Sequence, residues 1–273
     1  MSIKAPLFIL LFILNLYGSQ RIVSLSPSIT EIAYGLKMGN ALVATTFYSL
    51  YPKVAKKLPI IGGDSNPNIE KIISLKPTLV VGQTFNHATM EKLKYFHIKT
   101  LTLQLQTIET IKHSIALFGK TVSKTKEANK LITTITDAIK NVKKSKVEHS
   151  VLIVYGLHED LRSGIYVAGN HIFFNDIIKL TGNTNAYQSH TVSQPVLNYE
   201  NILALNPEQI IILHSHATEP NVNVKKALAN WYAIPTKAAE HKRISIVDED
   251  YLYIPSQRVA LTIERLSKEM NHD

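Results

Sequence analysis

Short runs of β-branched and other apolar residues alternate along the chain with longer stretches in which apolar side chains recur every three or four positions. The short runs are typical of strands buried in a parallel sheet, and the longer spacing is typical of helices that pack one face on such a sheet. Strands are expected at residues 21–25, 41–45, 78–81 and 100–103, and again at 150–156, 210–213 and 243–247. The alternation predicts an α/β fold with two parallel-sheet lobes, one in each half of the chain.

A long helical stretch separates the two halves. Residues 108–142 contain no proline and one glycine, Gly119. Apolar residues in this stretch recur at helical spacing and form one stripe: Ala128, Leu131, Ile132, Ile135, Ala138, Ile139 and Val142. We therefore predict a rigid connecting helix within a helical segment, 108–146, that separates an N-terminal lobe, 20–107, from a C-terminal lobe, 147–273.

One phrase occurs twice, once in each half. Residues 68–77 read Asn-Ile-Glu-Lys-Ile-Ile-Ser-Leu-Lys-Pro, and residues 198–207 read Asn-Tyr-Glu-Asn-Ile-Leu-Ala-Leu-Asn-Pro. In both, a helix is expected to begin near the glutamate, Glu70 or Glu200, and to end before the proline. An acid at a helix start complements the helix dipole, which is a sufficient reason for either residue alone. Its repetition on two lobes indicates two matched contact points on the surface.

The first 19 residues form a separate segment. Lys4 precedes an apolar run at 5–16, and small residues follow at 18 and 19. This arrangement is typical of a secretory signal peptide, and the run is too short for a comfortable membrane span. We expect cleavage near Gln20, with an uncleaved membrane anchor as the alternative.

The composition also predicts a cellular compartment and argues against several kinds of partner. The sequence contains no cysteine, which removes disulfides, thiolate metal ligands and a lipid-anchored cysteine. A periplasmic protein that is not lipid-anchored is expected. An exported chain whose net charge of +9 is spread over predicted helix faces is not expected to meet nucleic acid. We also expect a monomer without a cofactor of its own.

Several of these features together resemble one family. They are residues 21–31 (Arg-Ile-Val-Ser-Leu-Ser-Pro-Ser-Ile-Thr-Glu), the two glutamate phrases, the helical connector, and Trp231 followed by Pro235, Ala238 and Arg243. The mature chain as a whole resembles the periplasmic solute-binding proteins that feed ABC importers of metal chelates such as ferric siderophores, heme and cobalamin. The resemblance implies a class III periplasmic binding protein, in which a single long connecting helix joins two Rossmann-like lobes and the ligand lies in the cleft between them.

The resemblance also implies a partner, an ABC permease in the inner membrane. Glu70 and Glu200 fall on positions where the family carries an acid on each lobe that pairs with arginines of the permease. One exposed ion pair contributes little energy, but two that lie far apart fix the orientation of docking. No enzymatic activity is expected, because no nucleophile elbow, phosphate loop, zinc-protease or dinucleotide motif occurs. An exported hydrolase built on residues 158–160 and His241 is the alternative of another class.

The cargo is predicted from departures within the family. Phrase by phrase the chain is most similar to the cobalamin-binding members, and Tyr48 and Asp250 match residues that line their pocket. Asp64, Gln83 and Gln194 stand where those members stack tryptophans on the ligand. Because a corrin face gains much from aromatic burial, we expect a ferric siderophore or a related iron or nickel chelate, with cobalamin as the alternative.

Ligands of open α/β sheets bind beyond the carboxyl ends of the strands, where this chain carries several histidines and tyrosines. Imidazole is a common ligand of transition metals, so His190, His214 and His216 are candidate contacts to a metal, directly or through its chelator. Tyr251 and Tyr253 offer phenolate oxygens or a ring, with packing at a lobe margin as the alternative. A bare zinc or manganese site is a second alternative. The predicted ligand set is Tyr48, Asp64, Gln83, His87, His190, Gln194, His214, His216, Asp250, Tyr251 and Tyr253.

Overall fold

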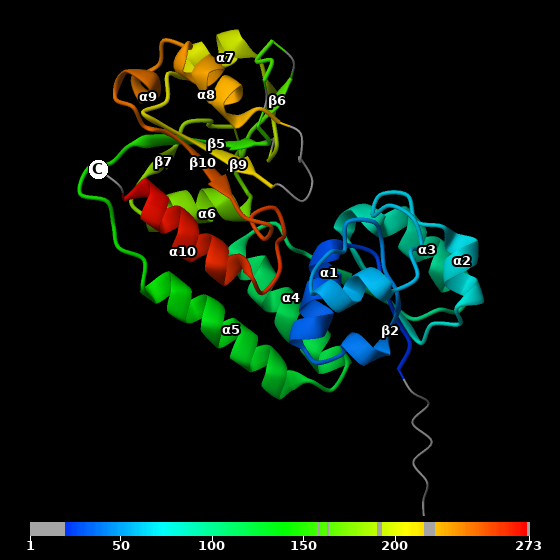
Figure 1. Cartoon of the computed structure of the whole chain (residues 1–273). Coiled ribbons are helices and arrows are strands. Elements are labelled where there is room, and N and C mark those ends of the chain that lie inside the picture. Colours follow the sequence, from blue (N-terminus) through cyan, green and yellow to red (C-terminus); the bar gives the residue numbers. More distant parts are fainter. Residues whose placement is uncertain (1–19, 158, 163, 190–192, 216–221, 272–273) are drawn as a thin grey trace, which may run out of the picture.

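The computed structural model describes residues 20–157, 159–162, 164–189, 193–215 and 222–271. They form two lobes at opposite ends of the molecule, with long helices passing between them (Figure 1). The predicted signal peptide, residues 1–19, lies outside the described residues. No helix in the described part of the chain is both long enough and apolar enough to span a membrane.

Lobe one contains a four-stranded parallel sheet in the order β2-β1-β3-β4. Its strands are β1 (Ile22–Ser24), β2 (Leu42–Ala44), β3 (Leu79–Gln83) and β4 (Thr100–Leu103). Its helices are α1 (Pro27–Gly35), α2 (Ile69–Ser74) and α3 (His87–Tyr95), with single 3-10 turns η1 (Gly39–Ala41), η2 (Lys53–Lys57) and η3 (Thr84–Asn86).

Lobe two contains a second four-stranded parallel sheet, in the order β10-β9-β5-β7. Its strands are β5 (Ser150–Tyr155), β7 (Thr184–Asn185), β9 (Gln209–His214) and β10 (Ile244–Asp248), and a separate antiparallel pair is formed by β6 (Ile165–Tyr166) and β8 (Val196–Leu197). Its helices are α6 (Phe173–Leu180), α7 (Tyr199–Leu205), α8 (Val224–Tyr232), α9 (Lys237–Glu240) and α10 (Val259–Met270). The predicted α/β fold with two parallel-sheet lobes is confirmed.

The repeated phrase is a repeat of structure as well as of sequence. In each sheet the strand after the phrase, β3 or β9, lies beside the first strand of its lobe, β1 or β5. Asn68 caps α2 by accepting a hydrogen bond from the Lys71 backbone N–H, and Asn198 caps α7 in the same way, with the N–H of Asn201 as donor. Both helices are followed by a residue with positive φ directly before the proline, Lys76 at 48° and Asn206 at 46°. The prolines therefore follow the same left-handed turn in both lobes.

The helical segment between the lobes is two helices rather than one continuous helix. α4 (Ile108–Thr121) ends, the chain turns with Ser123 at a φ of 59°, and α5 (Thr125–Lys140) begins. α5 packs on α1 at lobe one and on α10 at lobe two, so it is the single helix that carries the chain across (Figure 1). Gly119 permits the hairpin, because a Cβ added there would lie 2.5 Å from the Cβ of Ala128.

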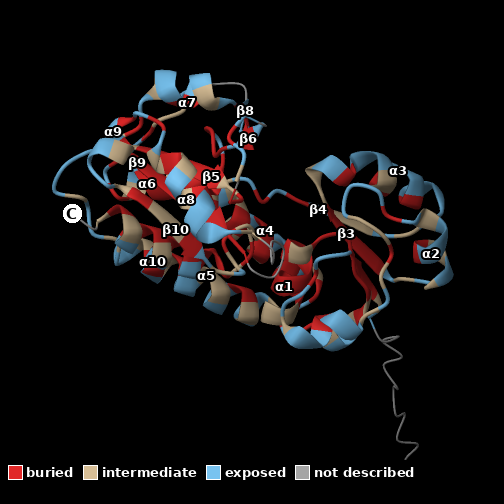
Figure 2. Ribbon diagram, turned by 45° about the horizontal axis from the view of Figure 1, so that its top comes forward, coloured by how far each residue is buried: buried red, intermediate tan, exposed pale blue. Residues whose placement is uncertain are grey.

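Alternate side chains of each sheet point to opposite faces and belong to two different apolar layers. In β9, Ile211 belongs to a core that continues from lobe two through α10, α5 and α4 into lobe one, whereas Ile212 faces a second core around Trp231. A third, smaller core lies under α2 and α3. Buried residues accordingly line the strands and the inner faces of α1, α4, α5 and α10 (Figure 2). The two lobes share one apolar layer. Outside this layer, where the lobes join, polar side chains of the two halves can meet.

Candidate functional site

Two loops that leave strand carboxyl ends meet where the lobes join. The loop after β2 supplies Tyr51, and the loop after β10 supplies Asp250, Ser256 and Arg258, while Glu31 comes from α1. We call these five residues the junction cluster. The family resemblance pointed to Asp250, but sequence reasoning missed Arg258 and treated Glu31 as a residue of a helix start. The only sequence feature that points to Glu31 is its position as an acid between Thr30 and Ile32 in a short apolar helix.

Arg258 is the centre of the junction cluster. Its Nε donates to Glu31 Oε2 over 2.9 Å and its Nη2 donates to Glu31 Oε1, while Nη1 donates to Asp250 Oδ1 over 2.8 Å. The Ser256 hydroxyl donates to Glu31 Oε2 over 2.5 Å. Burial raises the pKa of Glu31, and the hydrogen bonds and charge of Arg258 oppose that rise. A bidentate guanidinium–carboxylate contact of this kind has a fixed planar geometry.

Lobe one presents several aromatic side chains to solvent, among them Tyr51 of the cluster. Phe47, Tyr48 and Tyr51 are 55%, 71% and 41% exposed, and Phe85 in η3 is 53% exposed. Tyr48 has a φ of 64°, and its carbonyl accepts a hydrogen bond from the Leu50 N–H. An uncommon backbone conformation combined with an exposed ring is typical of a residue placed for binding.

Hydrogen bonds tie these lobe-one loops to one another. Phe47 N–H donates to the Gly62 carbonyl, the Asn86 side chain donates to the Asp64 carbonyl over 2.6 Å, and Gln83 Nε2 donates to Ser26 Oγ over 2.9 Å. Below them lies a buried hydroxyl network of Ser24, Thr30, Thr45 and Ser49, which sequence reasoning did not find. Tyr48 and Asp64 thus sit exposed on a fixed loop framework, whereas the amide nitrogen of Gln83 is already engaged.

On the lobe-two side the tyrosines are partly committed to the fold. The Tyr253 hydroxyl donates to the Leu213 carbonyl over 2.6 Å and accepts from the Gly156 N–H, and its ring stacks on Tyr155 at 6.0 Å. Burial raises the pKa of Tyr155, and a hydrogen bond with the Gln194 side chain opposes the rise. Tyr251 is half-buried, 5.7 Å from the Arg258 guanidinium. This arrangement favours ring packing over iron coordination for Tyr253, and it places Gln194 beside the same tyrosine pair.

Of the four predicted histidines, the structure describes His87 and His214. His214 lies in β9 with 1% of its surface exposed, in register with Asp248 of β10. His87 is exposed at the start of α3, with its Nδ1 4.0 Å from Glu91. His190 and His216 lie outside the described residues, and the described part of the chain holds no group of three or more His, Asp or Glu residues arranged for a metal ion. Metal contact by His190, His214 and His216 therefore stays a prediction.

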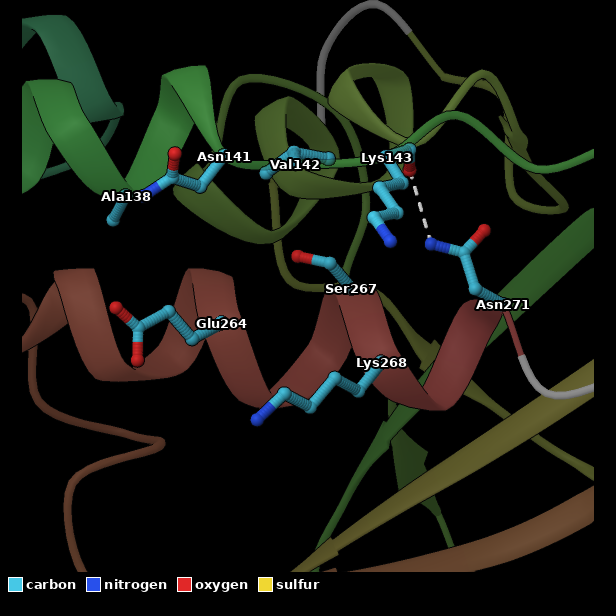
Figure 3. A pocket seen from close by; sticks show the side chains of 8 residues that line it. All are labelled: Ala138, Asn141, Val142, Lys143, Glu264, Ser267, Lys268 and Asn271. Atoms are coloured by element: carbon cyan, nitrogen blue, oxygen red, sulfur yellow. Dashed lines mark hydrogen bonds between the residues drawn. The ribbon is translucent and has the colours of Figure 1, made fainter.

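A cavity of about 470 Å³ opens between α5 and α10, away from the predicted ligand set (Figure 3). It is lined by Ala138, Asn141, Val142, Lys143, Glu264, Ser267, Lys268 and Asn271. A hydrogen bond of 3.0 Å from Asn271 Nδ2 to the Lys143 carbonyl crosses one end. The lining contains none of the residues predicted to bind ligand. Ligand binding in this cavity and ligand binding between the lobes can therefore be distinguished by experiment.

Glu70 and Glu200 occupy matched positions. Each is the second residue of its helix, α2 or α7, and each is exposed. The two helices lie on different lobes, far apart in Figure 1. The geometry supplies two separated acidic points, as the repeated phrase predicts.

The burial of His214 leads to a first prediction. Replacing His214 by Ala should lower the free energy of unfolding by about 1–3 kcal/mol, because a buried side chain in a central strand is lost. Urea unfolding of the ligand-free protein measures this. The matched change His87→Ala, at an exposed position, should have an effect below about 0.5 kcal/mol. Equal stabilities of the two variants would show that His214 is not part of the packed core.

Comparisons with known proteins agree with this architecture. The family described as "Periplasmic binding protein" matches residues 22–251. An uncharacterized ABC transporter substrate-binding lipoprotein of Bacillus subtilis, YvrC, is 30% identical over 267 residues, which cover 93% of this chain and 81% of the relative. A vitamin B12-binding protein of Vibrio cholerae is 26% identical over 253 residues, covering 92% of this chain and 88% of the relative.

Solved structures show the same fold at lower identity. The periplasmic vitamin B12 binding protein BtuF of Vibrio cholerae has a TM-score of 0.76 at 24% identity, covering 92% of this chain and 96% of that one. IsdE of S. aureus complexed with heme has a TM-score of 0.75 at 22% identity, covering 94% and 100%. Their names give different ligands, vitamin B12 and heme, so the shared fold does not select a ligand for this chain.

Proposed function

Because this chain belongs to the family of periplasmic binding proteins, we propose that it captures a metal chelate between its two lobes and delivers it to the permease of an ABC importer. Members of the family are solute-binding transport proteins and not enzymes, so the exported-hydrolase alternative falls away. The observation that carries the proposal is the junction cluster, where Tyr51 of lobe one and Asp250 of lobe two contact the same guanidinium. A ligand seated there would touch both lobes.

The first candidate cargo is a ferric siderophore or a related iron or nickel chelate. The exposed side chains of Asp64 and Gln194 offer polar groups to a chelator, while the exposed rings of Phe47 and Phe85 offer apolar surface. Gln83 lies in the same loops, with its amide bonded to Ser26. A chelator that carries aryl rings together with hydrogen-bonding groups would match both kinds of surface.

A tetrapyrrole, cobalamin or heme, is the second candidate. The exposed lobe-one aromatics favour it, because they could stack on a flat ring where tryptophans are missing from the sequence. Relatives named for vitamin B12 and heme belong to the same fold. The two candidates differ in how much aromatic stacking the site must supply, which a ligand screen can separate.

We also propose that the mature protein resides in the periplasm without a lipid anchor and acts as a monomer. The support is the cysteine-free sequence, since the lipoprotein relative's kind of anchor needs a cysteine. Release of the protein by osmotic shock without detergent tests this location, and sedimentation tests the monomer.

A thermal-shift and native mass-spectrometry screen tests the cargo. Ferric catecholate siderophore, nickel chelate, heme and cyanocobalamin are compared at equal concentrations. A ligand present at about 100 times its Kd stabilises the native state by about 2.7 kcal/mol, which should raise the Tm by about 5–10 °C. We expect the largest rise with the ferric siderophore. A larger rise with cobalamin or heme would transfer the cargo to the tetrapyrrole class.

The lobe-one aromatics should contribute to affinity and not to folding. Tyr48→Ala and Phe85→Ala each remove ring surface worth about 1.5–3 kcal/mol when buried by a ligand, so the Kd for the best ligand of the screen should rise about 10- to 100-fold. Isothermal titration calorimetry measures the Kd. Tyr95→Ala, a ring 81% exposed at the end of α3, is the matched control and should leave the Kd unchanged. Equal effects at positions 48 and 95 would remove this surface from the site.

The paired acids should act in transport and not in ligand capture. Glu70→Lys combined with Glu200→Lys should abolish uptake through the cognate permease, because both docking points then repel its arginines. The Kd of the purified protein for its ligand should stay unchanged. Asp137→Lys with Glu240→Lys makes the same charge change at exposed sites on α5 and α9 and should preserve uptake. Normal uptake by the first double variant would refute the docking role.

A further inference from the structure

We infer that Arg258 is the positioning residue of the binding site: one buried guanidinium sets the relative position of the lobes and holds a ligand-facing side chain of each. The part that concerns ligand rests on the proposed function. The part that concerns lobe position stands on the geometry alone and can be tested without ligand.

The contacts of Arg258 reach residues that lie far apart in the sequence. Glu31 belongs to lobe one and is separated from Arg258 by 227 positions, yet it receives two of its hydrogen bonds. The third goes to Asp250 of lobe two, whose side chain is 56% exposed although that of Arg258 is only 10% exposed. Arg258 is therefore buried on the side of Glu31 and opens toward solvent through Asp250.

Tyr51 adds a second link between the lobes. The carbon at the centre of the Arg258 guanidinium lies 3.9 Å from the centroid of the Tyr51 ring. Guanidinium groups stack on aromatic faces at this separation. The loop of Tyr51 also carries Phe47 and Tyr48, so stacking on a lobe-two residue fixes the lobe-one loop that presents the exposed rings.

A buried ion pair is a poor way to gain stability, because desolvation of both charges offsets their attraction. Its planar fork does, however, accept only one relative placement of the two groups. α5 carries the chain across, and the shared apolar layer and a hydrogen bond from the Phe173 N–H to the Gln106 carbonyl also join the lobes. Apolar packing does not by itself select one tilt of the lobes. The Glu31–Arg258 contact at the junction does, which explains a buried pair in a position where apolar residues would pack.

The contacts of Arg258 also determine which ligand groups the site can bind. The cluster contains one cation and two carboxylates, and Glu31 takes the two-pronged contact, so Asp250 keeps an exposed carboxylate. Such a group accepts hydrogen bonds. A chelate that presents hydroxyl, amide or ammonium donors toward lobe two fits it, whereas a bare carboxylate on that side does not.

The test uses the absence of cysteine in the sequence. Cysteines introduced as Glu70→Cys and Glu200→Cys, one on each lobe, carry spin labels, and double electron–electron resonance measures their distance distribution in the ligand-free protein. We expect a narrow distribution that broadens with Arg258→Lys, which keeps the charge but not the planar fork or the stacking. Arg265→Lys, in the helix that Arg258 precedes and in a partly buried pair with Glu269 of the same helix, should leave it narrow. An unchanged distribution in Arg258→Lys would overturn the inference.

A binding cycle tests the ligand part. Tyr51→Leu and Asp250→Asn should each weaken binding tenfold or more, and their combined effect should be less than the product of the two. In the Arg258→Lys background the two effects should become independent, because the shared support is gone. Independent effects in the parent protein would overturn the positioning of ligand contacts by Arg258. Broadened lobe distances with no binding of any chelate would refute the proposed cargo and leave the lobe-positioning role standing.

If Arg258→Lys does not fold, Glu31→Asp replaces it in the distance measurement, since it keeps the charge but shortens the side chain that receives both hydrogen bonds. A broadened distribution in Glu31→Asp supports the inference. A distribution as narrow as that of the parent overturns it.

Discussion

The inferred determinant of how the two lobes are placed is a buried ion pair between them, Glu31 with Arg258. Apolar packing continues from one lobe to the other through α4, α5 and α10, but such packing tolerates sliding and tilting more readily than a bidentate ion pair does. The pair sits where loops from the carboxyl ends of β2 and β10 arrive, with Tyr51 stacked on it and Asp250 bonded to it. The same guanidinium therefore joins the two lobes and contacts two side chains of the candidate site.

The two lobes repeat one structural module, and this repeat separates the glutamates from the junction. The same strand order, the same asparagine cap and the same left-handed turn before a proline occur in both halves. Two copies of one module place Glu70 and Glu200 on well-separated, equivalent surfaces, while the junction stays free for loops that differ between the lobes. The proposed docking points and the proposed ligand contacts therefore lie on different parts of the repeat, so changes in one set need not disturb the other.

Local patterns predicted much of the fold. The strands expected from β-branched runs lie within two residues of the observed ones, and the helices expected near Glu70 and Glu200 begin one residue before each glutamate. The break at Ser123 was not predicted, because the turn uses neither proline nor glycine at the residue with positive φ. The short strands β6 and β8 were also missed, since two residues carry no measurable periodicity.

The site was less predictable, for a physical reason. Alternation in a strand says that His214 and Leu213 face opposite sides, but it does not say which side is covered, and His214 is buried. The Glu31–Arg258 contact joins residues 227 positions apart, so no local signal announces it. By contrast, Tyr48 and Asp250 were identified from their resemblance to family residues, and both are exposed in the structure. Their contact with a ligand stays a prediction.

The most direct test of the account is hydrogen exchange of the amides, measured with and without the chelate that stabilises the protein most. If the ligand lies between the lobes, protection should increase together in residues 46–54 and 83–86 of lobe one and in residues 249–258 of lobe two. Exchange in the ends of α5 and α10 that line the cavity of Figure 3 should stay the same. Protection confined to one lobe, or centred on that cavity, would contradict a ligand held at the junction by both lobes.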